Sequence, residues 1–348
     1  MIVKKSTCLG ILLLFLSSLS VSCAEDDPYD FSKKEVTDFL DESNTQDSDT
    51  INEGNLENED EFDGNFVFTL YAENSYTNQS AAVFGDYLFL VPKYRGKIYM
   101  YSLKEKKLLC AYTLGAQKEV NSSGGDIYHC NQTCFGTDYY DMDDPFPLLY
   151  ISQRARSDKR CFTEVFRITA EKSAQDNEYS SFKLELVQTI YYPPMSEANS
   201  LGNVNTVIDR DNSLLYTYSR NNAKEDANYR QCKITCFEIP DIHQKEVYLE
   251  DIDIKKSFML DISALYMQGA CIEGGYLYIA RGATSVGYID VNIINLKTQK
   301  MVRQLDLLHK GYRWEPEGCF FYNGYLMIST GNSLWKLEMT NGMVDKSI

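Results

Sequence analysis

Gly85-Asp86-Tyr87-Leu88-Phe89-Leu90-Val91 is a polar, glycine-containing turn followed by a run of apolar and aromatic residues, and the phrase recurs four times in the chain. A run of this kind after a turn is typical of a buried β-strand. Aligned on their leucines, successive copies are 61, 66, 62 and 49 residues apart. Self-similarity at such a period indicates a fold built from repeated sheets. The later copies are Pro147-Leu148-Leu149-Tyr150-Ile151, Asp211-Asn212-Ser213-Leu214-Leu215-Tyr216-Thr217-Tyr218, Gly274-Gly275-Tyr276-Leu277-Tyr278-Ile279 and Asn323-Gly324-Tyr325-Leu326-Met327-Ile328.

Each copy has strand-like segments on both sides, so it reads as one strand of a unit of about four. Segments of this length between polar turns are typical of antiparallel sheets. The segments before the phrase are 81–84, 202–208, 269–272 and 318–322. The strands after it are 97–103, 164–168, 233–239, 291–296 and 333–337, and a further strand is expected at 107–113, 182–190, 245–249 and 301–307.

The last copy lacks an outer strand, because only a short stub follows residue 337. Residues 65–71 can add as the outermost strand of that copy, which removes an open sheet edge. The sequence therefore predicts an all-β fold, a β-propeller of five blades of about four antiparallel strands, closed by an N-terminal strand. A β-sandwich with long hairpins is the alternative, but it would not require five equivalent phrases.

Residues 1–22 have the composition of a secretory signal peptide. Lys4 and Lys5 precede an apolar run that is too short to span a bilayer, and small residues come before Cys23. The residues around Cys23 resemble a bacterial lipoprotein signal, with Ser20 where leucine is more usual. The resemblance implies cleavage before Cys23, lipidation of that cysteine and attachment to the outer membrane.

Residues 23–64 are strongly acidic, with 16 Asp and Glu residues against Lys33 and Lys34, so most of the net charge of -16 lies there. So much like charge with few apolar residues predicts a solvated tether, and residues 65–348 form the propeller domain. Ala24-Glu25-Asp26-Asp27 resembles the export signals of surface lipoproteins of the Bacteroidota, which implies exposure at the cell surface. A generic acidic spacer on an anchor that faces the periplasm is the open alternative.

Eight cysteines follow Cys23, and eight cysteines allow 105 pairings, so spacing alone fixes none of them. Cys232 and Cys236 cannot pair within one straight strand. Most of the eight are expected to be buried thiols that act as small apolar side chains. His129-Cys130-Asn131-Gln132-Thr133-Cys134 contains soft metal ligands but lacks the second half of a closed zinc site.

The chemistry of a propeller is expected at its innermost strands and at the loops above them, which converge on the central channel. Two unusual phrases fall there: the one that contains Asn131, and Tyr312-Arg313-Trp314-Glu315-Pro316-Glu317-Gly318. With Asn205 and with Gln79 or Gln268, they predict a ring of amides and carboxylates that suits a sugar or calcium. Exposed tyrosines are expected on the blade tops, at Tyr139, Tyr140, Tyr192 and Tyr312.

These residues carry a resemblance to uncharacterised β-propeller lipoproteins of the Bacteroidota, and a more distant one to five-bladed propellers of phage receptor-binding proteins. It covers most of residues 65–337. Glu315-Pro316-Glu317-Gly318 also resembles a segment of calcium-dependent propeller lactonases and phytases, which implies Glu317, Asn131 and Asn205 as ligands of a calcium ion that activates water. No aspartate-plus-histidine set accompanies it, because His243 and His309 are expected on surface turns.

Two functions remain, and a binding or scaffold role is preferred to an enzyme. In the first, a surface-tethered monomer without a cofactor presents the propeller to a glycan, peptide or protein at a channel mouth lined by Asn131, Asn205, Tyr312, Trp314 and Glu317. In the second, the protein is a calcium-dependent hydrolase or lactonase. Nucleic acid is not expected as a partner, because the basic residues are scattered. In a purely architectural interpretation, Gly136 and Gly318 allow tight turns and Trp314 packs between blades.

Overall fold

A computed structural model describes residues 64–70, 78–92, 97–113, 130–153, 160–175, 177–193, 201–221, 226–228, 230–331 and 333–337. The chain divides into two compact units, residues 1–53 and 54–348, and every described residue belongs to the second. The predicted signal peptide, Cys23 and the acidic tether up to residue 63 lie outside the described residues. Within the described part, no helix is long and apolar enough to cross a membrane.

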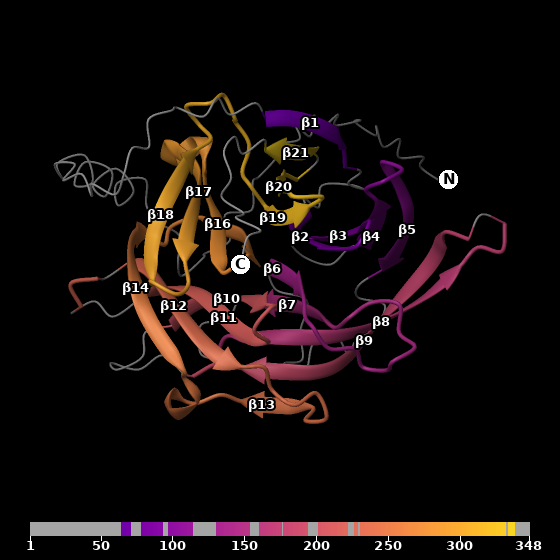
Figure 1. The fold of residues 1–348 in the computed structure, drawn as a ribbon, viewed down its shortest axis with the longest axis horizontal. Helices are drawn as coiled ribbons and strands as arrows, with labels where there is room; N and C mark the ends of the chain where they lie inside the picture. Colours follow the sequence, from indigo (N-terminus) through magenta and orange to yellow (C-terminus); the bar gives the residue numbers. More distant parts are fainter. Residues whose placement is uncertain are drawn as a thin grey trace, which may run out of the picture. The chain divides into compact units, whose positions relative to one another are not determined.

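The described strands form five antiparallel sheets of four strands, one of which gains a fifth strand, and the sheets follow one another around a ring (Figure 1). This is the predicted five-bladed β-propeller. Blade 1 consists of β2 (Asn78–Phe84), β3 (Tyr87–Pro92), β4 (Lys97–Ser102) and β5 (Lys107–Thr113). Blade 2 consists of β6 (Cys130–Phe135), β7 (Leu149–Gln153), β8 (Phe162–Lys172) and β9 (Tyr179–Tyr191).

The other three blades repeat the same order from the innermost strand outward. Blade 3 consists of β10 (Leu201–Asp209), β11 (Leu214–Asn221), β12 (Gln231–Glu238) and β14 (Lys256–Ser263). Blade 4 consists of β15 (Met267–Glu273), β16 (Tyr276–Ala283), β17 (Tyr288–Asn295) and β18 (Lys300–Asp306). Blade 5 consists of β19 (Gly318–Tyr322), β20 (Tyr325–Ser329), β21 (Ser333–Leu337) and β1 (Gly64–Thr69).

One strand assignment from the sequence is wrong. Residues 245–249 were expected to form the outer strand of blade 3, but β13 (Glu246–Tyr248) pairs in parallel with β9 and is the fifth strand of blade 2. The outer strand of blade 3 is β14, whose Leu260 and Ile262 are buried in the core between blades 3 and 4. Burial of this alternating apolar face decides the pairing, and β13 has only three residues and no buried side chain.

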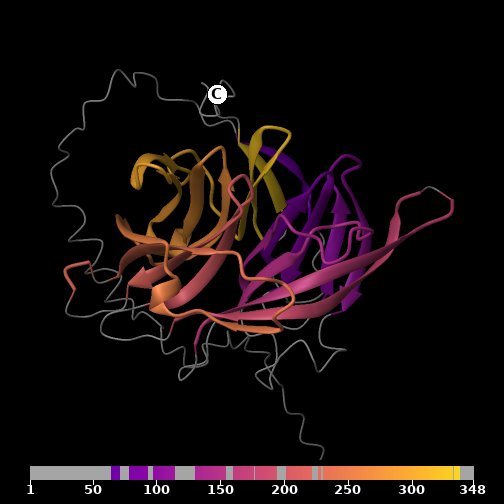
Figure 2. The same cartoon turned by 60° about the horizontal axis from the view of Figure 1, so that its bottom comes forward.

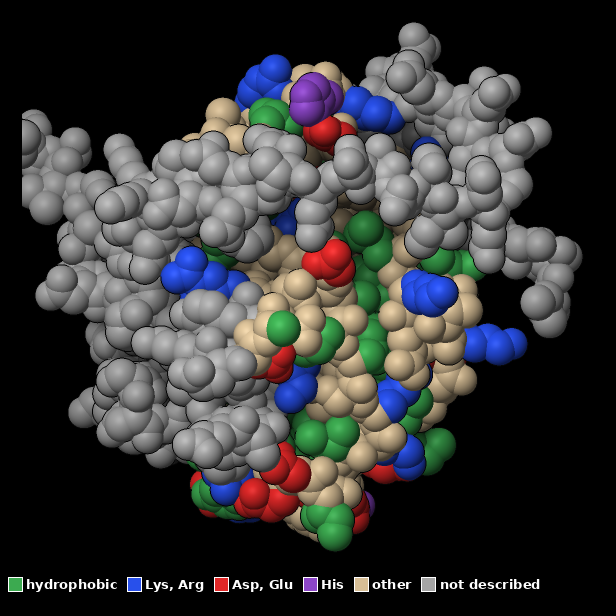
Figure 3. Space-filling model, turned by 90° about the vertical axis from the view of Figure 1, so that its left-hand side faces the viewer, with side chains coloured by type: hydrophobic (Ala, Val, Ile, Leu, Met, Phe, Trp, Pro, Cys, Tyr) green, Lys and Arg blue, Asp and Glu red, His purple; other side chains and the backbone are tan. Residues whose placement is uncertain are grey.

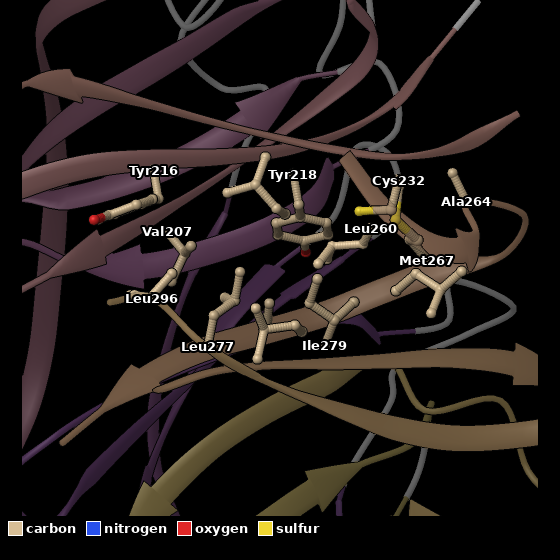
Figure 4. Packing of buried hydrophobic residues seen from close by; sticks show 14 of the residues in the cluster. Val207, Tyr216, Tyr218, Cys232, Leu260, Ala264, Met267, Leu277, Ile279 and Leu296 are labelled. Atoms are coloured by element: carbon tan, nitrogen blue, oxygen red, sulfur yellow. The ribbon is translucent and has the colours of Figure 1, made fainter. Parts of the chain in front are cut away.

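The blades pack through layers of buried side chains. Figure 4 shows the layer between blades 3 and 4, where Val207 and Tyr218 lie against Leu277 and Ile279. Burial of an aliphatic side chain of this size stabilises the fold by about 1.5–3 kcal/mol. The β8–β9 hairpin is much longer than its counterparts and extends beyond the ring of blades (Figure 2).

The innermost strands of blades 4 and 5 approach each other closely. A Cβ atom on Gly269 would lie 2.6 Å from Gly318 Cα, and one on Gly318 would lie 2.7 Å from Ala81 Cβ. Neither glycine has a positive φ, so their role is to let backbones approach, and the tight turn predicted at Gly318 is wrong. Gly136 also serves close packing, because its Cβ would lie 2.6 Å from the Tyr150 ring.

The ring closes through β1, which pairs antiparallel with β21 and so completes blade 5, as the sequence predicts. The two strands come from opposite ends of the described chain. Without β1, the edge of β21 would present unpaired backbone groups to solvent, which promotes aggregation.

Deletion of residues 1–69 tests this closure. We expect the midpoint of thermal unfolding to fall by roughly 10 °C, since each kcal/mol lost shifts the midpoint of a domain of this size by a few degrees. We also expect light scattering to increase because the edge of β21 is exposed. Deletion of residues 1–53 is the control, and a deletion of 1–69 that behaves like this control would contradict the proposed role of β1.

Candidate functional site

The five innermost strands, β2, β6, β10, β15 and β19, are neighbours around the channel. Their pairing with the second strand of each blade aligns them, so that Gln79, Asn131, Gln268 and Glu317 fall at one level and Gln132 and Asn205 fall one residue further on. Four of the five strands have a register shift at these levels. A β-bulge takes a residue out of the ladder and redirects its side chain.

Two of these strands, β2 and β15, and the loop before β19 contribute a hydrogen-bonded group that we call the polar ring: Gln79, Gln268, Glu315 and Glu317. Gln79 Nε2 donates to Glu317 Oε2 and, at 3.5 Å, to Gln268 Oε1. Gln268 Nε2 donates to Glu315 Oε1. Gln79, Gln268 and Glu317 are buried, and hydrogen bonds to ionised groups stabilise more than neutral ones do. The ring thus places two carboxylates at the end of the channel where the inner strands begin.

Gln132 links three blades one residue further along the channel from this level. It comes from blade 2, yet its Nε2 donates to the carbonyl of Ala270 in blade 4 at 2.8 Å and its Oε1 accepts from the Ala270 N–H at 2.9 Å. Tyr218 OH from blade 3 shares its one hydrogen between the same Oε1, at 3.2 Å, and the carbonyl of Gln268. The Gln132 side-chain amide therefore pairs with the Ala270 backbone as a peptide group of a neighbouring strand would. Burial raises the pKa of Tyr218 well above its usual value, so this hydroxyl stays protonated and donates.

Asn205 and Asn131 differ in what the structure shows of them. Asn205 is 3% exposed, and its Oδ1 has no hydrogen-bond partner among the described residues. Asn131 lies in β6 at the level of Glu317, but its side chain is outside the described part. The next residue after Asn205, Thr206, is held by Thr163 Oγ1 at 2.7 Å and by Tyr192 OH. Asn205 is thus an acceptor on a rigid strand, available to a water molecule or a ligand.

Both tryptophans of the chain lie together beside the polar ring, with Tyr312 against them. Trp314 stacks on Trp335 with ring centroids 4.9 Å apart, and it remains 44% exposed. We call Tyr312, Trp314 and Trp335 the aromatic group. Trp314 and Glu315 are consecutive, so the aromatic group and the polar ring are joined directly in the chain.

The expectation of exposed tyrosines holds for Tyr139 and Tyr140 and is wrong for Tyr192 and Tyr312, which are 0% and 3% exposed. Tyr192 is buried because its hydroxyl bonds to Thr163 and Thr206 in the core between blades 2 and 3. Tyr312 packs edge-on against both tryptophans, and burial followed by the nearby Glu317 raises its pKa well above the usual value. Tyr312 is therefore a buried ring against which the exposed Trp314 packs.

The described residues do not form a complete calcium site. Glu317 and Glu315 accept from glutamine amides, and within the described part no group of three His, Cys, Asp or Glu side chains could hold a metal ion. Calcium prefers six to eight oxygen ligands. His243 and His309 are exposed on turns, as expected. Calcium thus remains a prediction.

The opposite end of the channel contains a cavity of about 110 Å³ between the five inner strands. Most of its lining residues are apolar, Cys134, Cys271 and Cys319 are among them, and the charged residues Arg210 and Glu273 also line it. All eight cysteines after Cys23 are free thiols. Ala270, to which Gln132 is hydrogen-bonded, lines this cavity, whereas none of the four polar-ring residues does, so the channel has two chemically different ends.

No protein-family model and no curated protein sequence matches the chain. Glutaminyl cyclase from Myxococcus xanthus is similar in fold, with a TM-score of 0.42 and 12% identity over 79% of this chain and 95% of that one. Hydrazine synthase from Kuenenia stuttgartiensis has a TM-score of 0.41 and 11% identity over 75% and 76%, and a gluconolactonase from Xanthomonas campestris has 0.38 and 12% over 72% and 68%. Similarity at this level carries no argument about activity, and the resemblance to Bacteroidota and phage proteins stays a prediction.

Replacement of Gln79 by leucine tests the polar ring. The variant Gln79→Leu removes a buried donor from Glu317 and should lower the free energy of unfolding by about 1–3 kcal/mol. Urea denaturation measures this change. Gln231→Leu is the matched control, because Gln231 Nε2 donates to Asp261 Oδ1 at 2.9 Å in an exposed position. Equal effects of the two substitutions would contradict the role given to Gln79.

Proposed function

We propose that the protein is a binding propeller that holds a glycan at the channel end where the inner strands begin. The observation that carries this proposal is Trp314, an exposed indole with Trp335 behind it and the carboxylates of Glu315 and Glu317 beside it in the chain. A binding site needs an apolar surface with a few fixed polar groups. Sugar rings fit such a site because they have an apolar face and a rim of hydroxyl groups.

The aromatic group suits this task because its geometry is already fixed. Trp335 covers one face of Trp314, and its indole N–H donates to Ser333 Oγ at 2.9 Å. Tyr312 is packed at the edge of both rings. A ligand that stacks on the open face of Trp314 therefore orders few side chains, and the cost in conformational entropy is small.

The polar ring supplies the hydrogen-bond acceptors. Glu315 lies next to Trp314 in the chain, and Asn205 offers an unpartnered Oδ1 further down the channel wall. Hydroxyl groups of a sugar donate to carboxylate and amide oxygens. Asn131 is included in the proposed site on the basis of its place in β6, level with Glu317.

The proposed setting is the cell surface, where lipidated Cys23 and the acidic segment 23–64 would tether a monomeric propeller. Nucleic acid is not proposed as the partner, because the basic residues are scattered along the sequence. Figure 3 shows one side of the molecule, where basic and acidic side chains are interspersed on the part that is described. A peptide or protein on the same aromatic group is the other outcome that binding experiments can return.

Glycan arrays probed with the full chain test the function. The variant Trp314→Ala should weaken binding roughly 5- to 150-fold, since loss of one aromatic stacking surface costs about 1–3 kcal/mol. Tyr139→Ala is the matched control, because Tyr139 is 41% exposed in the segment that connects β6 to β7, at the other end of the channel. Retention of full glycan binding by Trp314→Ala would contradict the proposed site. Binding of a protein and of no glycan would show that the ligand is a protein and would contradict the proposed ligand class.

The calcium-dependent hydrolase is tested by elemental analysis of the full chain and of Glu317→Gln. One bound calcium per chain, lost in the variant, would favour the hydrolase and call for a screen of esters and lactones. We expect no stoichiometric calcium in either protein, because the Glu317 carboxylate already accepts from Gln79.

A further inference from the structure

The cavity at the far end of the channel contains a pair of thiols in contact. Cys271 Sγ and Cys319 Sγ lie 3.8 Å apart, on the innermost strands of blades 4 and 5. Both line the cavity of about 110 Å³. Cys319 is 2% exposed, and Cys271 is partly exposed, so a small molecule in the cavity meets Cys271 first.

The backbone brings these thiols within bonding range. Gly269 and Gly318, which lie two residues before Cys271 and one before Cys319, allow β15 and β19 to approach so closely that a Cβ on Gly269 would lie 2.6 Å from Gly318 Cα. A disulfide requires Cα atoms about 4.4–6.8 Å apart. Pairs on neighbouring strands meet this requirement only where the strands are close, which is the condition found here.

We infer that Cys271 and Cys319 form a redox-active dithiol site in the channel, which a small disulfide oxidant converts into a disulfide that links blades 4 and 5. The site faces the cavity, and its chemistry does not depend on glycan binding, although Tyr312 of the aromatic group packs in the same apolar cluster as both cysteines. The oxidant enters the cavity, which Arg210 and Glu273 also line.

The reaction is two successive thiol–disulfide exchanges. The thiolate of Cys271 attacks one sulfur of the oxidant, the S–S bond of the oxidant breaks, and one thiolate leaves. The thiolate of Cys319 then attacks the Cys271 sulfur of the mixed disulfide and expels the second thiolate. The two protons lost by the cysteines go to the two leaving thiolates, so one protein disulfide and two small thiols are formed.

The rate should depend steeply on pH. Burial, followed by the neighbouring Cys319, raises the pKa of Cys271 well above its usual value. The thiolate is therefore rare at neutral pH, and the rate should rise about 10-fold per pH unit from pH 7 to 9. The titratable or charged groups around Cys271 are Glu273 on its own strand and Cys319 and Tyr278 on adjacent strands. Cys134, Tyr218 and Arg210 lie across the channel, and Tyr312 packs near Cys319.

The experiment treats the full chain with 2-hydroxyethyl disulfide at pH 8, blocks the remaining thiols and maps peptides by mass spectrometry. We expect one new cross-linked peptide pair that joins Cys271 to Cys319, with a mass lower by two hydrogen atoms. Cys134 lines the same cavity, but its sulfur donates to the Thr206 carbonyl at 3.5 Å. Cys134→Ser is therefore the matched control and should retain the cross-link, whereas Cys319→Ser should stop at the mixed disulfide on Cys271.

The peptide map of the unsubstituted chain decides the inference even if a variant folds poorly. Free thiols at both positions after treatment would show that the two cysteines act only as small apolar side chains. A mixed disulfide on Cys271 that persists in the unsubstituted chain, or a bridge from Cys271 to another cysteine, would also overturn the inference.

Discussion

The close approach of the five innermost strands is the constraint on which this structure depends. Gly269, Gly318 and Ala81 allow it, since a Cβ on either glycine would collide with a neighbouring strand. The narrow channel brings side chains of different blades within hydrogen-bond distance. The polar ring and the thiol pair are both consequences of it: the polar ring joins blades 1, 4 and 5, and the thiol pair joins blades 4 and 5.

Some backbone N–H and C=O groups that face the narrow channel lack a partner in the sheet, and side chains supply their hydrogen bonds. Register shifts in four of the inner strands leave backbone groups outside the ladder. The side-chain amide of Gln132 satisfies two such backbone groups, the N–H and the carbonyl of Ala270, as a peptide group of an added strand would. A buried polar group without a partner costs about 1–3 kcal/mol, so these amides are as structural as the apolar layers between blades.

Much of the fold could be predicted because each blade repeats a local pattern. The phrase around Leu88 and its four copies are β3, β7, β11, β16 and β20, and β1 closes the ring as expected. Strands without a strong apolar face were harder to assign from the sequence, and β13 was assigned to the wrong blade because its pairing is decided by tertiary contacts.

At the site, the channel-facing position of Gln79, Gln268 and Glu317 could be predicted. The role of Gln132 was missed, although it follows Asn131 at the level of Asn205, because a bridge across the channel leaves no local signal. The burial of Tyr192 and Tyr312 was missed for the same reason.

The tryptophan emission of the full chain, followed as a glycan is added, tests the central claim most directly. The chain has only two tryptophans, and both belong to the aromatic group beside the polar ring. Binding on the open face of Trp314 should change the emission spectrum saturably, with the same dissociation constant that calorimetry gives for that glycan. A glycan that binds by calorimetry and leaves the emission unchanged would place the ligand elsewhere on the propeller and contradict the account.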